Sequence, residues 1–237
     1  MTHFLLLHGS WHGAWCWHKV LPRLVAAGHT ATAIDLPGRG RSPAWAPCVS
    51  LGRMVRAAER ALAPHTQSTV VVHSRNGIVA SQLAELAPDR VARTIYLASF
   101  MLPAGRRVLD YVPDRASAIA KHIHVDRAAL TDRLDPKLYR EGLYADCSSD
   151  DVALADAMLV PEPIRPALAR LRLTPARYDR VPRSYIRLTE DRAVSLSLQD
   201  QLLRETSVDE VADIRGSHSV YFSKPDELTQ TILHLAR

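Results

Sequence analysis

Short apolar runs alternate with amphipathic segments along most of the chain. The runs HFLLLH at 3–8 and STVVVH at 68–73 are typical of strands that are buried on both faces. Segments with helical spacing separate such runs, and the first of them, 14–27, ends at Gly28, a common helix terminator. This alternation predicts a parallel sheet with helices packed on both faces.

The later periodic segments continue the same pattern. Amphipathic segments that stop before Pro64 and Pro88 predict helices at 51–63 and 75–87, because proline does not fit a helix interior. Further strands are expected at 30–35, 91–99, 184–189 and near 209–214, and further helices near 195–205 and at 225–235.

The alternation breaks between residues 103 and 182. This segment holds most of the prolines and many charges, and it predicts short helices, such as 150–158, joined by irregular turns. It follows the carboxyl end of a strand, the sheet edge where ligands bind, so it is placed to cover a site as a cap; a surface insertion without function is the alternative. The predicted organisation is a doubly wound α/β core, 1–102 and 183–237, with a helical cap insertion at 103–182.

Composition narrows the class of protein. The 237 residues, 47% of them hydrophobic, suffice for one full core. Without a membrane-length apolar run or a signal peptide, a cytoplasmic protein with no membrane contact is expected. The net charge is +5, but the arginines are scattered, which argues against nucleic-acid binding. The cysteines and histidines lack metal-ligand spacing, so neither a metal nor an organic cofactor is expected.

Ser74 lies where a β-branched strand runs directly into a helix, in the segment VVVHSRNG at 70–77. A serine at such a junction sits on a sharp turn that raises its hydroxyl above the sheet edge. The following helix presents free N–H groups to the same point and favours negative charge there. Ser74 is therefore a candidate nucleophile, with a helix N-cap as the alternative.

Asp191 and His218 lie in loops that are predicted at the same sheet edge as Ser74. The chain order Ser, Asp, His is that of the α/β-hydrolases, in which the histidine accepts the serine proton and the acid orients the histidine. Glu190 is an alternative to Asp191 as the orienting acid.

The segment HGSWHG at 8–13 directly follows the first predicted strand. Glycine at position 9 lets the backbone turn back over the site. The N–H groups of Ser10 and Arg75 are then the candidate donors of an oxyanion hole. A simple strand-to-helix turn is the alternative.

Nearly the whole chain resembles the hydroxynitrile lyase and plant methylesterase branch of the α/β-hydrolases. The similarity is carried by HGSWHGAWCWHKVLPRLVAAGH, AIDLPGRGRS, YLASFMLPAG, VPRSYIRLTEDRAV and IRGSHSV, and it is looser across the cap. The lyases carry threonine where this chain has Gly9 and lysine where it has Ser219. The resemblance therefore implies a bacterial-type esterase, and a homodimer would fit this branch.

Three residues around Ser74 depart from the esterases of this branch, which usually carry glycine, an apolar residue and glycine at the positions of Val72, Arg75 and Asn76. The side chain of Arg75 has two alternatives. It reaches the pocket and pairs with a substrate carboxylate, or it is satisfied by the cap or by an acid on a neighbouring helix.

The predicted function is hydrolysis of a carboxylic ester, or a related acyl bond, of a small and largely apolar substrate through an acyl-enzyme on Ser74. The alternatives are a lyase or cofactor-free oxygenase on the same scaffold, and a degenerate hydrolase that binds a small molecule. The pocket is expected between the sheet edge and the cap, with candidate lining residues Gly9, Trp11, His12, Trp15, Phe100, Met101, Tyr144 and Ser219.

Overall fold

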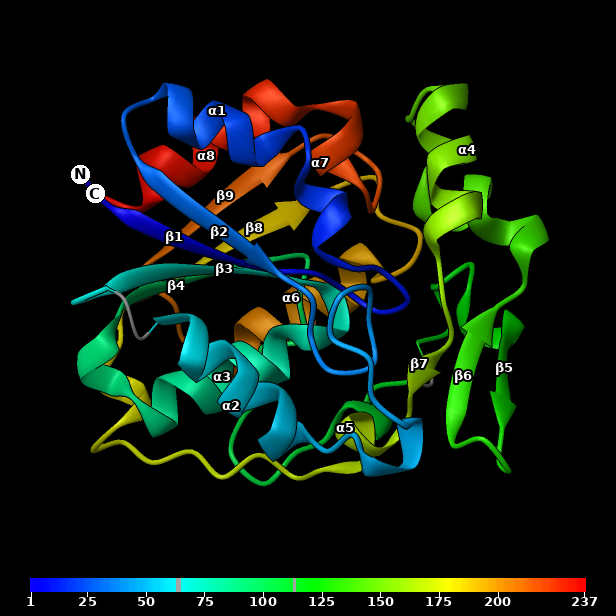
Figure 1. Cartoon of the computed structure of the whole chain (residues 1–237), viewed down its shortest axis with the longest axis horizontal. Coiled ribbons are helices and arrows are strands. Elements are labelled where there is room, and N and C mark those ends of the chain that lie inside the picture. Colours follow the sequence, from blue (N-terminus) through cyan, green and yellow to red (C-terminus); the bar gives the residue numbers. More distant parts are fainter. Residues whose placement is uncertain (63–64, 113) are drawn as a thin grey trace.

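A six-stranded parallel sheet lies at the centre of the molecule (Figure 1). The computed structural model describes residues 1–62, 65–112 and 114–237. The strands of this sheet are β1 (His3–Leu7), β2 (Thr30–Ile34), β3 (Ser68–His73), β4 (Val91–Leu97), β8 (Arg183–Leu188) and β9 (Glu210–Ile214). Their order is β2-β1-β3-β4-β8-β9, and every neighbouring pair is parallel. Each strand lies within two residues of its predicted bounds.

Helices cover both faces of the sheet, which confirms the predicted α/β fold. Figure 1 shows α1 (Val20–Ala26) and α8 (Pro225–Leu235) on one face, and α2 (Leu51–Leu62) and α3 (Gly77–Leu86) on the other. The other helices are α4 (Ser149–Met158), α5 (Arg165–Leu168), α6 (Leu196–Glu205) and α7 (Val220–Ser223). None of the helices in the described residues is both long and apolar enough to span a bilayer.

The central strands contribute to two hydrophobic cores, because successive strand residues point to opposite faces of the sheet. In β1, Leu5 and Leu7 pack in the core that includes residues of α2, α3 and α6. Phe4 and Leu6 pack in the core that includes residues of α1 and α8. This two-sided burial explains why β1 is a continuous apolar run rather than an alternating one.

Two predicted helices begin differently from the prediction. Instead of one helix over 14–27, a 3₁₀ turn (Ala14–Trp17) precedes α1. Pro22 has no N–H to continue a helix across this point, and it lies in the first turn of α1, where none is needed. The helix predicted from residue 75 likewise starts as a 3₁₀ turn (Ser74–Asn76) and becomes α-helical only in α3. The predicted stop at 63–64 lies outside the described residues.

The segment 103–182, called here the cap segment, is only partly helical. The predicted helix at 150–158 is present as α4, but the segment also contains β5 (Ile123–Asp126), β6 (Thr131–Leu134) and β7 (Glu162–Pro163). These strands form a small antiparallel sheet in the order β5-β6-β7. Strands of two to four residues are too short to show a period of two in the sequence. Figure 1 shows this sheet and α4 beyond the carboxyl ends of the central strands.

Candidate active site

Ser74 occupies a sharp turn between β3 and α3. Its φ is +57°, in the left-handed region that costs a residue other than glycine roughly 1–2 kcal/mol. Its carbonyl oxygen accepts hydrogen bonds from the N–H of Phe100 (3.0 Å) and the hydroxyl of Ser99 (2.6 Å). These contacts stabilise a backbone conformation that exposes the Ser74 hydroxyl at the sheet edge.

The unusual neighbours of Ser74 are accommodated in this turn. Gly77 supplies the close packing, since a Cβ there would lie 2.6 Å from the carbonyl oxygen of Phe100. Asn76 is buried, and its Nδ2 donates to the carbonyl oxygen of His8 (2.7 Å), which ties the turn to the end of β1. Val72 is fully buried in the core. The sharp turn is therefore present with valine and asparagine at positions 72 and 76.

The structure brings His218 and Asp191 to Ser74 from two other loops. Nε2 of His218 lies 3.1 Å from Oγ of Ser74, and Nδ1 lies 2.7 Å from Oδ2 of Asp191. The other carboxylate oxygen of Asp191 accepts two backbone N–H groups, at 2.7 and 3.0 Å. With a carboxylate at Nδ1, the proton of a neutral His218 lies there, and Nε2 is left to accept the serine hydrogen. Glu190, the alternative acid, pairs instead with Arg215 (2.7 Å).

The loop around His218 is held at two successive residues by groups from elsewhere in the fold. The N–H of Ser217 donates to Asp146 of the cap segment (3.0 Å). Nε2 of His73 donates to the carbonyl oxygen of His218 (3.0 Å). Burial, and then the nearby His218 and His12, lower the pKa of His73 well below its usual value, so this ring is neutral. Sequence reasoning missed His73, whose only signal is its place directly before Ser74.

Two further histidines fix the backbone of residues 9–11. Nδ1 of His8 donates to the carbonyl oxygen of Gly9 (2.8 Å), and Nδ1 of His12 donates to that of Ser10 (2.6 Å). Burial lowers the pKa of His8 to about 4 and that of His12 to about 3, so both rings are neutral near pH 7. A trans peptide directs the N–H of Ser10 away from the Gly9 carbonyl, to the side opposite His8. Ser10 and Arg75, the two predicted oxyanion donors, line the same pocket as Ser74.

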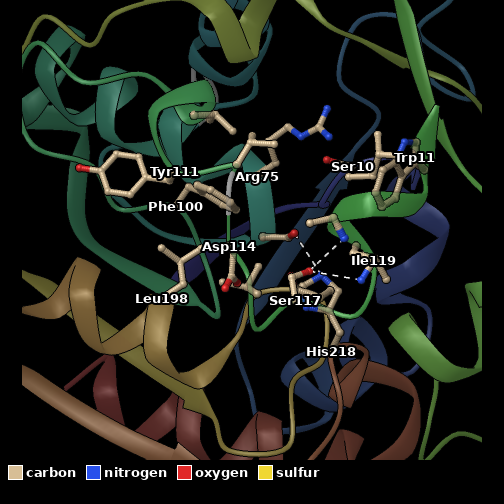
Figure 2. A pocket seen from close by; sticks show the side chains of 17 residues that line it. Ser10, Trp11, Arg75, Phe100, Tyr111, Asp114, Ser117, Ile119, Leu198 and His218 are labelled. Atoms are coloured by element: carbon tan, nitrogen blue, oxygen red, sulfur yellow. Dashed lines mark hydrogen bonds between the residues drawn. The ribbon is translucent and has the colours of Figure 1, made fainter. Parts of the chain in front are cut away.

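A pocket opens beside Ser74 and His218 (Figure 2). Trp11 and Phe100 line it, as predicted. Figure 2 shows Tyr111 and Leu198 among its other walls. Most of the remaining lining is apolar and comes from the cap segment and the loop between β8 and α6, namely Val108, Val112, Ile119, Ala120, Ile123, Ala193 and Val194. In the described part of the chain, no group of three or more His, Cys, Asp and Glu side chains is arranged to hold a metal ion.

Comparison with known proteins identifies the family. Residues 4–231 match the model of the alpha/beta hydrolase family. The chain belongs to this family. It is 32% identical over 257 residues to the probable esterase PIR7A of Oryza sativa, covering 99% of this chain and 96% of that protein. It is 31% identical over 250 residues to the putative methylesterase 11, chloroplastic, of Arabidopsis thaliana, covering 100% of this chain but 64% of the length of that relative. These relatives confirm the predicted methylesterase-like branch.

A solved structure agrees with this assignment. The pyrethroid hydrolase from Sphingobium faniae JZ-2 superimposes on this hydrolase with a TM-score of 0.91 at 26% identity, covering 99% of this chain and 97% of that one. The agreement extends over the cap segment as well as the core.

Several predicted pocket residues of this hydrolase lie elsewhere. Met101, Tyr144 and Ser219 are fully buried, and His12 is 1% exposed. Nε2 of His12 contacts the hydroxyl groups of Tyr144 and Tyr221. These contacts hold the His12 ring in place, and its Nδ1 binds the backbone of residues 9–11. These side chains are not among the residues that line the described pocket, so their role as pocket residues stays a prediction. The predicted residues that are absent from the described lining are Gly9, His12, Trp15, Met101, Tyr144 and Ser219.

The Arg75 side chain of the hydrolase pairs with the cap segment, which is the second of its two alternatives. Nη1 lies 2.7 Å from Oδ2 of Asp132, and Nη2 lies 3.4 Å from Oδ1. The guanidinium also lies over the ring of Trp11, 5.5 Å from its centre. Its charge is therefore already matched by a carboxylate, so Arg75 does not offer a free charge to an acidic substrate.

Proposed function

We propose that this hydrolase cleaves a carboxylic ester, or a related acyl bond, of a small and largely apolar substrate through an acyl-enzyme on Ser74. The observation that carries this proposal is the pair of hydrogen bonds from Ser74 to His218 and from His218 to Asp191, at the wall of an apolar pocket. The esterase and methylesterase names of the relatives support the same reaction class.

In the first half of the reaction, Oγ of Ser74 attacks the ester carbonyl carbon while its proton passes to Nε2 of His218. The carbonyl oxygen becomes an oxyanion, which accepts hydrogen bonds from the N–H groups of Ser10 and Arg75. Asp191 stays ionised and stabilises the imidazolium. The C–O bond to the alcohol then breaks, and His218 returns its proton to the leaving oxygen.

In the second half, a water molecule attacks the acyl-enzyme. His218 takes a proton from this water, and the same two N–H groups stabilise the second oxyanion. The bond between the acyl carbon and Ser74 Oγ breaks, Ser74 regains its proton from His218, and the acid leaves. Each half begins and ends with neutral His218, so no external cofactor is required.

We further propose that residues 103–182 act as a cap over a core of residues 1–102 and 183–237. Side chains of this segment, such as Val108, Tyr111 and Ile119, form much of the pocket wall, which supports a role in substrate selection. The homodimer and the cytoplasmic location stay predictions.

Neither alternative function is favoured by a specific contact. A lyase of this branch needs a cation where this chain has Ser219, whose hydroxyl hydrogen bonds instead with Tyr221 (3.0 Å). A binder without chemistry would require Val72 and Asn76 to deform the turn at Ser74, yet this turn is sharp and the Ser74 hydroxyl contacts His218.

The test is a comparison of wild type with Ser74→Ala. We expect a fluorophosphonate to label wild type at Ser74, and p-nitrophenyl acetate to show a burst followed by turnover. Both signals should vanish in the variant, with a rate loss of roughly 10⁴-fold or more. Ser149→Ala, which changes an exposed serine, is the control and should behave as wild type.

Labelling at Ser74 with ester turnover supports the proposal. A folded wild type that is neither labelled nor active on small esters would contradict it and favour a binder or an oxygenase. Turnover that survives in Ser74→Ala would contradict the acyl-enzyme.

A further inference from the structure

All the polar groups of Trp11 are bound by the cap segment. The N–H of Trp11 donates to Oε2 of Glu162 (2.8 Å), and its indole Nε1–H donates to Oδ1 of Asp132 (2.8 Å). Its carbonyl oxygen accepts the N–H of Val160 (3.0 Å). Trp11 directly follows Ser10, the first proposed oxyanion donor. The position of that donor therefore depends on contacts made by the cap segment.

The second proposed donor is tied to the same place. Arg75 pairs with Asp132, and Asp132 lies directly opposite Glu162 in the register of β6 and β7. Both sides of the proposed oxyanion hole are thus anchored to one short strand pair. Figure 2 shows Ser10, Trp11 and Arg75 along the same side of the pocket.

The backbone at Trp11 needs this support. Its φ is +61°, which for a bulky residue costs roughly 1–2 kcal/mol. The Ser10–Trp11 peptide is held from both sides, by His12 on its carbonyl oxygen and by Glu162 on its N–H. Without Glu162, the N–H would be buried and unpaired, and rotation of this peptide would relieve the strain. Ser10 joins this peptide to the preceding one, which carries the Ser10 N–H, so the change is transmitted to the oxyanion donor through the Ser10 backbone.

Glu162 is kept ionised for this contact by two arginines. It forms an ion pair with Arg39, and the side chains of both are 1% exposed. Burial alone would raise the pKa of Glu162, but Arg39 and then Arg75 outweigh it and hold the pKa below its usual value. Two carboxylates and two guanidinium groups form a buried set without net charge, which lets the carboxylates lie inside the fold.

We propose that Glu162 is a positioning residue of the oxyanion hole. By accepting the N–H of Trp11, it holds residues 9–11 in the conformation that aims the Ser10 N–H at the reacting carbonyl oxygen. The hole is then complete only when the β6–β7 pair is docked on the core. This inference rests on the proposed acyl transfer, which is the reaction that needs such a hole.

The test compares two double variants that differ only in whether residue 162 can accept the hydrogen bond from the Trp11 N–H. Arg39→Met with Glu162→Gln removes the buried ion pair but keeps a side-chain oxygen at position 162. Arg39→Met with Glu162→Met removes the ion pair and the acceptor, at a similar side-chain volume and the same net charge. We call the variant with Arg39→Met and Glu162→Met the Met/Met protein and the other double variant the Met/Gln protein. We expect the kcat of the Met/Met protein to fall roughly 10- to 100-fold, less than after the full loss of an oxyanion donor, with KM nearly unchanged. The Met/Gln protein should keep most of the activity.

A second readout separates a positioning role from a general loss of structure. A small trifluoromethyl ketone adds to Ser74 Oγ as a tetrahedral oxyanion, with the serine proton on His218, so its binding needs the hole. The corresponding secondary alcohol binds the same pocket without forming this adduct. In the Met/Met protein, the inhibition constant of the ketone should rise in proportion to the loss of kcat/KM, while that of the alcohol stays constant. Equal kcat in the two double variants, or equal weakening of ketone and alcohol, would overturn the proposal.

Folding and the proposed function are controlled separately. An end-point fluorophosphonate titration counts folded sites, and kcat is expressed per labelled Ser74. Should the Met/Met protein not fold, Glu162→Asp keeps the charge near Arg39 but withdraws the acceptor by one methylene. It should then lose roughly fivefold or more in kcat at constant KM, and unchanged kcat would contradict the inference. A wild type without labelling or turnover would instead contradict the proposed function.

Discussion

Gly77 is the residue on which the nucleophile turn depends most directly. A side chain at this position meets the backbone of Phe100, which cannot swing aside as the end of a long side chain can. The N–H of Phe100 and the hydroxyl of Ser99 also donate the hydrogen bonds that hold the carbonyl oxygen of Ser74. Glycine at the start of α3 is thus required by close approach, because its φ is ordinary at −49°.

Gly77→Ala should therefore destabilise the protein and misplace Ser74. We expect the free energy of unfolding to fall by about 1–3 kcal/mol, the usual effect of forcing an atom into a packed site, and kcat to fall with it. Urea unfolding and ester turnover measure the two effects. Gly52→Ala is the matched control: it lies in α2 with open space around its Cβ, and the substitution should stabilise by about 0.5–1 kcal/mol. Equal effects of the two substitutions would contradict this account.

Individual residues were predictable from the sequence to different degrees. Ser74, Asp191 and His218 follow strands, and parallel strands bring their carboxyl ends to one edge, so their meeting could be predicted. The inward orientation of Tyr144 and Met101 could not, because both lie in irregular segments where no periodicity assigns a face. The sequence left two alternatives for the partner of the Arg75 side chain. Its pairing with Asp132 depends on a strand of the cap segment that the sequence did not indicate.

At the scale of elements, the loop between β9 and α7 carries His218 but is stabilised by another part of the chain. Asp146 of the cap segment accepts both the N–H and the hydroxyl of Ser217. The loop is therefore oriented by contacts that are distant in sequence.

Asp146→Ala should loosen this loop without touching the pocket. We expect kcat to fall roughly tenfold, because a small displacement of His218 disturbs its contact with Ser74, while KM stays nearly constant. Steady-state kinetics on a p-nitrophenyl ester measure both constants. Asp150→Ala, an exposed aspartate in the same segment, is the control. Unchanged kcat in Asp146→Ala would show that the loop keeps its place by other contacts.

The elements themselves were predictable where they are long. Strands of five to seven residues with apolar or β-branched side chains were found nearly to the residue. The small sheet β5-β6-β7 escaped prediction because its strands are short and partly exposed. Its pairing joins residues 131 and 163, a long-range contact that local sequence does not encode.

At the scale of the whole molecule, buried neutral histidines link stability to pH. His8, His12 and His73 lie together beneath the pocket, and burial lowers the pKa of each, to about 4 for His8 and about 3 for His12. In the unfolded chain these groups titrate near 6.5, so between roughly pH 4 and 6.5 the unfolded state binds more protons. Acid therefore favours unfolding in this window.

The free energy of unfolding should fall as the pH is lowered from 6.5 towards 4, by up to about 1.4 kcal/mol per pH unit for each of these histidines. Urea unfolding at several pH values measures this slope. His12→Asn should reduce it by about one proton, since an asparagine amide can donate to the Ser10 carbonyl but does not titrate. A flat profile would contradict the assignment of neutral buried rings.

The sequence by itself determined the parallel core, the family and the three residues proposed to carry out the reaction. These follow from local patterns, namely two-sided apolar strands and short motifs at strand ends, which a fixed topology then brings together. Only the tertiary structure decided which side chains line the pocket, how Arg75 is paired, and that Trp11 is held by Glu162 and Asp132. Those contacts join residues more than 50 positions apart, through short strands and buried charges. Packing of the whole chain determines which residues meet there, and no periodic pattern in the sequence indicates them.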